Sequence, residues 1–269
     1  VDTCGTGGDG QKTFNISTAA AFVVAGTGAV VAKHGNRAMS SSSGSADALE
    51  ALNVNIDLGP IDVQKCLEQV GIGFMFAQAF HPAMKFAGPL RPQIGIRTIF
   101  NLLGPLTNPA GADHQVIGMG DPGAAEKVAR ALQILGTSGA LVVYSEDGMD
   151  EISPEGKSHM YQVLDGQVSE RTVDASDFGL TERKRSDLTV NTVEESIGLI
   201  QGVLEGRNSG GVEQAARTVV VMNAAALLAV GRAKTLEQAA LLAADSIDSG
   251  KALDKLETLA AMSQMLALK

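Results

Sequence analysis

The sequence predicts an α/β fold in which helices flank a mainly parallel central sheet. Short apolar, β-prone runs alternate with helical stretches through the first half of the chain, which is the order of strands joined by crossover helices. From Val193 onward the chain is rich in Ala and Leu and has the pattern of consecutive helices. Hydrophobic residues make up 45% of the 269 residues but aromatic residues only 4%, so the core is built from small aliphatic side chains that allow helices to pack closely on a sheet.

The strands are expected where short apolar runs end at glycine or polar residues. The expected ranges are 1–4, 30–33, 73–77, 114–118 and 140–144. Residues 152–173 differ, because Pro154-Glu155-Gly156 and Asp165-Gly166 interrupt short β-prone pieces and thereby predict hairpins. Domains seldom begin abruptly on a core strand, so we expect a natural N-terminal portion to precede Val1.

The helices are expected from apolar residues at helical spacing. The expected ranges are 47–52, 61–70, 95–103, 123–135, 193–205, 211–231, 235–248 and 251–267. We expect the helix at 95–103 to be closed by Gly104-Pro105, and residues 181–187 to form a charged surface loop. The apolar stretch from Ala19 to Ala32 is interrupted by Gly26 and Gly28 and is shorter than the roughly 20 residues that span a bilayer, which favours a core helix.

The composition excludes several classes of protein. A net charge of −9 disfavours a nucleic-acid-binding surface, which needs clustered Lys and Arg. Cys4 and Cys66 are isolated and the chain shows no signal peptide, so we expect a cytoplasmic protein. The histidines lack zinc-protease or zinc-finger spacing, and no G-x-S-x-G motif occurs, which argues against a metallohydrolase or a serine hydrolase.

A glycine-rich turn, Gly5-Thr6-Gly7-Gly8-Asp9-Gly10, precedes an apolar helical stretch that opens at 15–18. Such a turn lets backbone N–H groups approach an anion at a helix N-terminus, which indicates a phosphate-bearing ligand. A dinucleotide site would need an acid about 20 residues later, and none lies between Asp9 and Asp47. A P-loop would need lysine where Gln11 stands. A plain tight turn remains the alternative, but a carboxylate at Asp9 favours a sugar phosphate bound with a cation.

Three further segments carry candidate side chains. Lys33-His34-Gly35-Asn36-Arg37 follows a strand and therefore lies at the sheet edge where α/β proteins bind ligands; a solvated basic loop is the alternative. Residues 40–45 offer a second anion site or a linker, and the acids at 146–151 could hold Mg²⁺ or form a solvated turn. Arg91 could bind a carboxylate through its forked guanidinium or form a structural salt bridge.

Together these motifs resemble the anthranilate phosphoribosyltransferases, the tryptophan-pathway members of a class that shares its fold with pyrimidine nucleoside phosphorylases. The similarity covers essentially the whole chain. It is carried by 5–10 with 15–18, by 33–37 continuing to 43–47, by Arg97-Thr98-Ile99-Phe100-Asn101-Leu102-Leu103-Gly104-Pro105-Leu106-Thr107-Asn108-Pro109, and by Asp147-Gly148-Met149-Asp150-Glu151-Ile152-Ser153.

The resemblance implies a Mg²⁺-dependent transfer of a phosphoribosyl group from phosphoribosyl pyrophosphate to anthranilate, with no dedicated general base. It implies that the donor is lined by Gly5, Gly8, Asp9, Thr13, Asn15, Ser17, Thr18, Lys33 and Ser45. It places Mg²⁺ at Ser17, Asp150 and Glu151. It places anthranilate at Gly5, His34, Asn36, His81 and Arg91.

The resemblance also implies a domain division. Residues 1–79 and 105–269 would form the α/β domain that binds the donor, and 80–104 a remnant of a small helical domain. Family members carry a helical segment before the glycine loop that usually forms the dimer contact, so a homodimer is expected when that segment is present. Two alternatives remain open: a pyrimidine nucleoside phosphorylase of the same fold, and a non-catalytic relative that binds nucleic acid or a protein.

Overall fold

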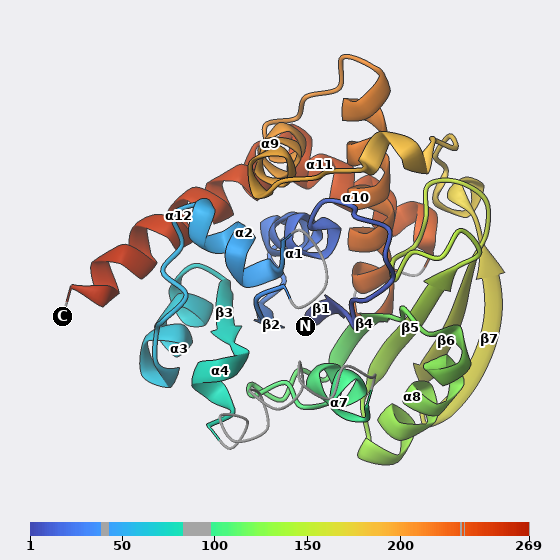
Figure 1. Ribbon diagram of the computed structural model, residues 1–269, viewed down its shortest axis with the longest axis horizontal. Coiled ribbons are helices and arrows are strands. Elements are labelled where there is room, and N and C mark those ends of the chain that lie inside the picture. Colours follow the sequence, from blue (N-terminus) through green and yellow to red (C-terminus); the bar gives the residue numbers. More distant parts are fainter. Residues whose placement is uncertain (39–42, 83–97, 232, 234, 269) are drawn as a thin grey trace.

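The computed structural model describes residues 1–38, 43–82, 98–231, 233 and 235–268 (Figure 1). Its larger sheet has the strand order β1-β4-β5-β6-β7, in which the first three strands are parallel and the last two pair antiparallel. The strands are β1 (Asp2–Gly5), β4 (His114–Gly118), β5 (Gly139–Ser145), β6 (Ser158–Leu164) and β7 (Gln167–Val173). The expected α/β class and the hairpin within 152–173 are confirmed.

A second, two-stranded sheet pairs β2 (Val31–Gly35) with β3 (Ile72–Phe76) in parallel. It lies against the first strand of the larger sheet, because the Ala32 N–H donates to the Val1 carbonyl at 2.9 Å. The ladder does not continue beyond this contact, so the strands count as two sheets. The carboxyl ends of β1, β2, β4 and β5 therefore lie near one another but are carried by separate sheets.

Helices surround the sheets (Figure 1). They are α1 (Ile16–Gly26), α2 (Ser45–Ala51), α3 (Pro60–Gln69), α4 (Ala77–Phe80), α7 (Phe100–Leu106), α8 (Pro122–Leu135), α9 (Val193–Leu204), α10 (Gly211–Gly231), α11 (Leu236–Asp248) and α12 (Lys251–Ala267), with 3₁₀ turns η2 (Ala175–Phe178) and η3 (Arg185–Leu188). Most expected helices are confirmed to within a few residues.

Helix α1 is the centre of the core. Every one of its residues except Ser17 is buried, which explains why its sequence is apolar on all sides rather than amphipathic. In Figure 1 it is seen end-on, with α2, α9 and α10 around it. Because this packing fixes α1, it also fixes the N-terminus of the helix, including Ser17, beside the carboxyl ends of the strands.

The two faces of the larger sheet are covered by different helices. Along β5, Leu141 and Val143 pack into the main core, whereas Val142 packs with α8 in a second cluster that includes Val128 and Leu132. This alternation follows from the two-residue period of a strand. Helix α8 is well delimited, because Asp121 accepts the Gly123 N–H at 3.0 Å at its start and Gly136 adopts a left-handed conformation at its end.

Helix α10 is apolar and long enough to cross a bilayer, and among the described helices it is the one that passes this test. Yet 78% of its most apolar window is buried inside the fold, in contact with α1 and α11. It is therefore a core helix of the α/β structure. Cys4 and Cys66 are both free thiols.

One expectation about helix ends is wrong. The helix expected to stop before Gly104-Pro105 instead runs to Leu106, with Pro105 inside it; of the expected start, residues 95–97 lie outside the described residues. Pro105 removes only the backbone bond to the Asn101 carbonyl, and at the helix end the Thr107 hydroxyl donates to the Leu103 carbonyl at 3.0 Å. The helix ends only one residue after the proline.

The packing of α1 can be tested by a pair of identical substitutions. A Cβ atom on Gly26 would lie 2.1 Å from Ser246 Oγ and 2.9 Å from the Ala252 backbone nitrogen, so Gly26→Ala is expected to lower the free energy of unfolding by about 2 kcal/mol. A Cβ on the exposed Gly198 of α9 meets nothing within 4 Å, so Gly198→Ala is expected to raise it by about 0.5 kcal/mol. Urea unfolding measures both, and effects of equal sign would contradict this packing.

Candidate active site

The glycine-rich turn adopts a backbone that side chains would oppose. Gly7, Gly8 and Gly10 have φ angles of 67°, 73° and 74°, in the left-handed region. The turn is fastened to the end of β4, because the Thr6 N–H donates to the Gly118 carbonyl at 2.8 Å and the Gly120 N–H donates to Thr6 Oγ1 at 2.9 Å. The turn therefore lies at the carboxyl ends of β1 and β4, where an anion would meet backbone N–H groups.

The acidic loop after β5 packs directly onto this turn. The Gly7 N–H donates to Asp150 Oδ2 at 2.7 Å, although 143 positions separate the two residues in sequence. A Cβ on Gly5 would lie 2.3 Å from the same oxygen, and a Cβ on Gly118 would lie 1.6 Å from the Asp150 carbonyl oxygen. Both positions must be glycine for the turn and the acid to approach this closely.

The acidic loop is held in shape by Asp147, within the acidic segment, and by Asn223, which the sequence analysis did not single out. Asp147 accepts the hydroxyls of Ser145 at 2.6 Å and Ser153 at 2.7 Å. Asn223, on α10, is fully buried and bonds both the N–H and the carbonyl of Ile152 at 3.0 Å. A lone buried Asn in an apolar helix is the one sequence signal that could have indicated this contact.

Acidic groups outnumber basic ones where these segments meet. Burial raises the pKa of Asp150 to about 7, and repulsion from Asp9 adds to the effect. Burial and the Asp150 charge also hold the pKa of Glu151 well above its usual range, although the Lys33 ammonium acts in the opposite direction. Burial lowers the pKa of Lys33, which is 2% exposed and donates from Nζ to the Thr3 carbonyl at 2.7 Å.

This excess of carboxylates fits a divalent cation. Asp9, Asp150 and Glu151 influence one another, and the Ser17 N–H bonds to Glu151, so the four groups share one small region. Within the described part of the chain, however, no three His, Cys, Asp or Glu side chains converge as a ready metal site. Mg²⁺ usually takes one or two protein carboxylates and completes its shell with water and substrate phosphates.

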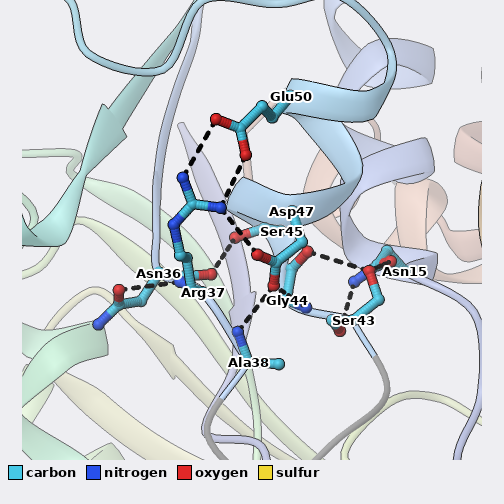
Figure 2. A network of polar contacts seen from close by, with 9 residues as sticks. All are labelled: Asn15, Asn36, Arg37, Ala38, Ser43, Gly44, Ser45, Asp47 and Glu50. Atoms are coloured by element: carbon cyan, nitrogen blue, oxygen red, sulfur yellow. Dashed lines mark hydrogen bonds and ion pairs between the residues drawn. The ribbon is translucent and has the colours of Figure 1, made fainter.

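Asn15 lies at the start of α1 and bonds to neighbouring segments instead of capping the helix. Figure 2 shows its side chain facing Ser43, whose hydroxyl donates to Asn15 Oδ1 at 2.9 Å and whose carbonyl accepts from Asn15 Nδ2 at 3.1 Å. In the first turn of α1, Thr18 Oγ1 is buried and has no hydrogen-bond partner. Thr13, just before this turn, forms an isolated bridge with Thr189.

A surface ion-pair network closes the loop that follows β2 (Figure 2). Arg37 bonds both carboxylate oxygens of Glu50, at 2.7 and 3.1 Å, and Asp47 at 3.0 Å. Asp47 Oδ2 also accepts the N–H groups of Ala38 and Gly44, each at 2.9 Å, which brings the two ends of the loop together. Arg37 is thus occupied by acidic partners, so its contribution is to the shape of the loop.

Asn36 and Ser45 lie on either side of this closed loop. Ser45 Oγ approaches the Asn36 carbonyl at 3.4 Å, and Asn36 Oδ1 accepts the Arg37 N–H at 2.8 Å. In Figure 2 the Asn36 side chain extends away from α2, with its amide nitrogen at the far end. The amide is therefore directed away from the ion-pair network.

His34, on β2, and His81, which directly follows α4, face each other. Their Nε2 atoms are 3.2 Å apart, and the rings meet edge to face with centroids at 5.0 Å. Burial lowers the pKa of His34 to about 4, with further contributions from His81 and Lys33. The His34 ring is therefore neutral at physiological pH and can either donate or accept one bond. Arg91, expected beside this pair, lies outside the described residues.

The structure thus brings the predicted residues into two neighbouring groups. The first joins the glycine turn to Ser17, Lys33, Asp150 and Glu151, and the second contains the histidine pair. A glycosyl transferase family model for the α/β domain matches residues 1–253. An anthranilate phosphoribosyltransferase from Roseiflexus sp. (strain RS-1) is 52% identical over 266 residues, which cover 98% of this chain and 77% of that protein.

The chain belongs to the anthranilate phosphoribosyltransferase family.

Solved structures of the family agree with this assignment. The crystal structure of the enzyme from Thermus thermophilus has a TM-score of 0.90 and 40% identity, with coverage of 98% of this chain and 77% of that one. The enzyme from Saccharomyces cerevisiae, solved in complex with PRPP and Mg, has a TM-score of 0.89 and 31% identity, with coverage of 98% and 73%. The pyrimidine nucleoside phosphorylase and nucleic-acid-binding alternatives are not favoured.

The raised pKa of Asp150 predicts how stability changes with pH in metal-free protein. At pH 8 the ionised, partly buried carboxylate opposes folding, so Asp150→Asn is expected to raise the free energy of unfolding by about 2 kcal/mol. The pKa of Asp150 is about 7 in the folded state and near the usual 3.8 in the unfolded state, so as pH falls below 7 the folded wild type takes up a proton before the unfolded chain does. The wild type is thereby stabilised, and the difference in free energy of unfolding between it and Asp150→Asn should shrink. Urea unfolding of both proteins in EDTA at pH 8 and pH 5 measures this difference. A difference that is the same at both pH values would contradict the raised pKa of Asp150.

Proposed function

We propose that this chain transfers the 5-phosphoribosyl group of phosphoribosyl pyrophosphate to the amine of anthranilate, which releases pyrophosphate in a step of tryptophan biosynthesis. The single observation that carries the proposal is the bond from the Gly7 N–H to Asp150 Oδ2 at 2.7 Å. It brings the glycine turn into contact with the acidic loop, which supports the proposal because a diphosphate bound with Mg²⁺ requires anion-binding N–H groups beside cation-binding acids. Membership of the family supports the same reaction.

The donor would occupy the glycine-turn group. Backbone N–H groups of the turn and the Lys33 ammonium offer positive potential to the phosphates, and the unpartnered hydroxyl of Thr18 offers a hydrogen bond. Asp9 would accept from the ribose hydroxyls. The full donor set of the proposal is Gly5, Gly8, Asp9, Thr13, Asn15, Ser17, Thr18, Lys33 and Ser45.

Ser17, Asp150 and Glu151 would hold Mg²⁺. The ion, when bound, stabilises the negative charge that develops on the departing pyrophosphate. The carboxylates hold it beside the turn, and their raised pKa values are expected to fall once the cation compensates their charge. In the absence of the cation, the same acids repel one another.

Anthranilate would lie against the histidine pair, with Gly5, Asn36 and Arg91 completing the pocket. Arg91 would bind the carboxylate through its fork, and the neutral His34 ring would orient the substrate by a single hydrogen bond. An aromatic amine needs little deprotonation before it attacks, so orientation contributes more than a strong base. As the C1–oxygen bond of the donor breaks, the sugar gains positive charge and the pyrophosphate carries away the bonding electrons.

Two expectations from the sequence stay predictions. One is a cytoplasmic location, and the other is a homodimer formed through a helical segment before the glycine turn. The division into an α/β domain and a small helical remnant at 80–104 is likewise a prediction, and residues 83–97 of that remnant lie outside the described ones. A pyrimidine nucleoside phosphorylase would use inorganic phosphate and should not need the acid pair at Asp150 and Glu151.

Anthranilate fluorescence tests the reaction directly. We expect the signal to fall only when protein, anthranilate, phosphoribosyl pyrophosphate and Mg²⁺ are all present, because each supplies a necessary part of the transfer. Replacement of anthranilate by a pyrimidine nucleoside with phosphate serves as the test of the alternative. Turnover of the nucleoside without loss of anthranilate would contradict the proposal.

Removal of the acid pair should abolish most of the activity. Asp150→Asn combined with Glu151→Gln is expected to lower kcat by roughly 100-fold or more, because the cation loses its anionic ligands. The matched control is Glu146→Gln, which neutralises an exposed acid of the same segment and should leave kcat within about twofold. Near-normal rates of the double variant at limiting Mg²⁺ would refute the metal assignment.

Arg91→Ala tests the carboxylate contact. Loss of a charge-assisted, forked bond is expected to raise the anthranilate KM by roughly tenfold or more, with a smaller change in the donor KM. Arg130→Ala, which removes an exposed arginine paired with Glu126 on α8, is the control and should change neither. An unchanged anthranilate KM for Arg91→Ala would place the carboxylate contact elsewhere.

A further inference from the structure

Asp2 is a fully buried carboxylate on β1 that the proposed reaction does not use. Its Oδ1 accepts the His34 backbone N–H at 3.3 Å, and its Oδ2 accepts from Asn108 Nδ2 at 2.8 Å. The same Asn108 nitrogen donates to the Ala32 carbonyl at 2.9 Å, and Asn108 Oδ1 accepts the Ala110 N–H at 2.9 Å. Asp2 and Asn108 thus connect β1, β2 and the segment after α7.

These contacts replace a missing piece of β-sheet. Ala32 N–H bonds to the Val1 carbonyl as in a regular parallel ladder. Two residues farther on, a regular ladder would pair the His34 N–H with the Thr3 carbonyl. Instead His34 bonds to the Asp2 side chain, and the Thr3 carbonyl accepts from Lys33 Nζ at 2.7 Å. Side chains therefore separate the two strands where the site begins.

The separation matters because the two strands carry different halves of the site. β1 leads into the glycine turn, whereas β2 carries Lys33 and His34 and leads to Asn36. Because His34 does not bond to the Thr3 carbonyl, this carbonyl accepts from the Lys33 ammonium, which also reaches Ser17 Oγ at 3.4 Å. The side chain of Asp2 fixes the backbone of His34, whose ring meets His81 at 3.2 Å.

We infer that Asp2, held by Asn108, is a positioning residue that sets the acceptor-binding histidine His34 at its distance from the glycine turn. The inference rests on the proposed function for its kinetic consequence, since it assumes that His34 orients anthranilate. A merely structural role would instead lower stability without a preference for one substrate.

The kinetic test uses Asp2→Asn, which keeps the shape of the side chain but leaves it one acceptor atom for two donors. We expect the anthranilate KM to rise roughly tenfold and the donor KM to rise less than about threefold. Asn108→Asp alone keeps the shape of that side chain but removes both of its donated bonds, to Asp2 and to the Ala32 carbonyl, so it should also raise the anthranilate KM in preference to the donor KM. Equal effects on both KM values would overturn the inference.

Ser263→Ala supplies the control for lost stability. Ser263 is buried on α12, accepts the Asn55 N–H at 2.9 Å and lies among residues unrelated to the site, so its removal should lower the melting temperature without changing either KM. If Asp2→Asn does not fold, Asn108→Ala carries the test, because it frees the carboxylate while leaving the His34 bond; it should raise the anthranilate KM in preference to the donor KM, and an equal rise in both would overturn the inference.

A substrate-free measurement separates this inference from the proposed function. In ¹⁵N-labelled protein, the imidazole resonances of His34 and His81 should shift in Asp2→Asn and stay in place in Ser263→Ala. Wild-type protein that fails to consume anthranilate would refute the proposed function, while the imidazole resonances would still decide the role of Asp2. Unmoved resonances in folded Asp2→Asn would overturn that role.

Discussion

The bond from the Gly7 N–H to Asp150 is the contact on which the rest of the site depends. It joins two loops 143 residues apart, each of which follows a strand of the larger sheet. The contact requires Gly5 and Gly118, because a Cβ atom at either position would collide with Asp150. Glycine in this region therefore has two separate functions: left-handed backbone at Gly7, Gly8 and Gly10, and close approach at Gly5 and Gly118.

The same contact concentrates negative charge in a place that opposes folding. A rise in the pKa of Asp150 from 3.8 to about 7 corresponds to about 4 kcal/mol against the ionised form. The surrounding structure tolerates this because hydrogen bonds hold the loop in place: Asn223 on α10 accepts the Ile152 N–H, and Asp147 accepts from the Ser153 hydroxyl. A divalent cation bound beside these carboxylates would offset their repulsion.

The sequence predicts local features well and distant contacts poorly. Strand and helix positions follow from the spacing of apolar residues, as in β5 and α10, and the glycine turn follows from composition alone. The end of α7 differs from the prediction only locally, because the helix accommodates Pro105 and ends at Leu106. Asn223 and Asn108 escape prediction for another reason: the partners of an isolated polar residue are backbone groups that only the fold brings to it.

The division of the site between two sheets explains why buried polar side chains gather at their junction. A continuous ladder between β1 and β2 would satisfy the backbone, but the Thr3 carbonyl would then bond to the His34 N–H instead of the Lys33 ammonium. Opening the ladder leaves the Ala32 carbonyl and the His34 N–H without strand partners, and Asn108 and Asp2 supply the missing bonds. Because each buried backbone group must find a partner, the opening is possible only with a donor and an acceptor of this kind in place. The same few residues therefore complete the hydrogen bonding between the strands and position the groups of the site.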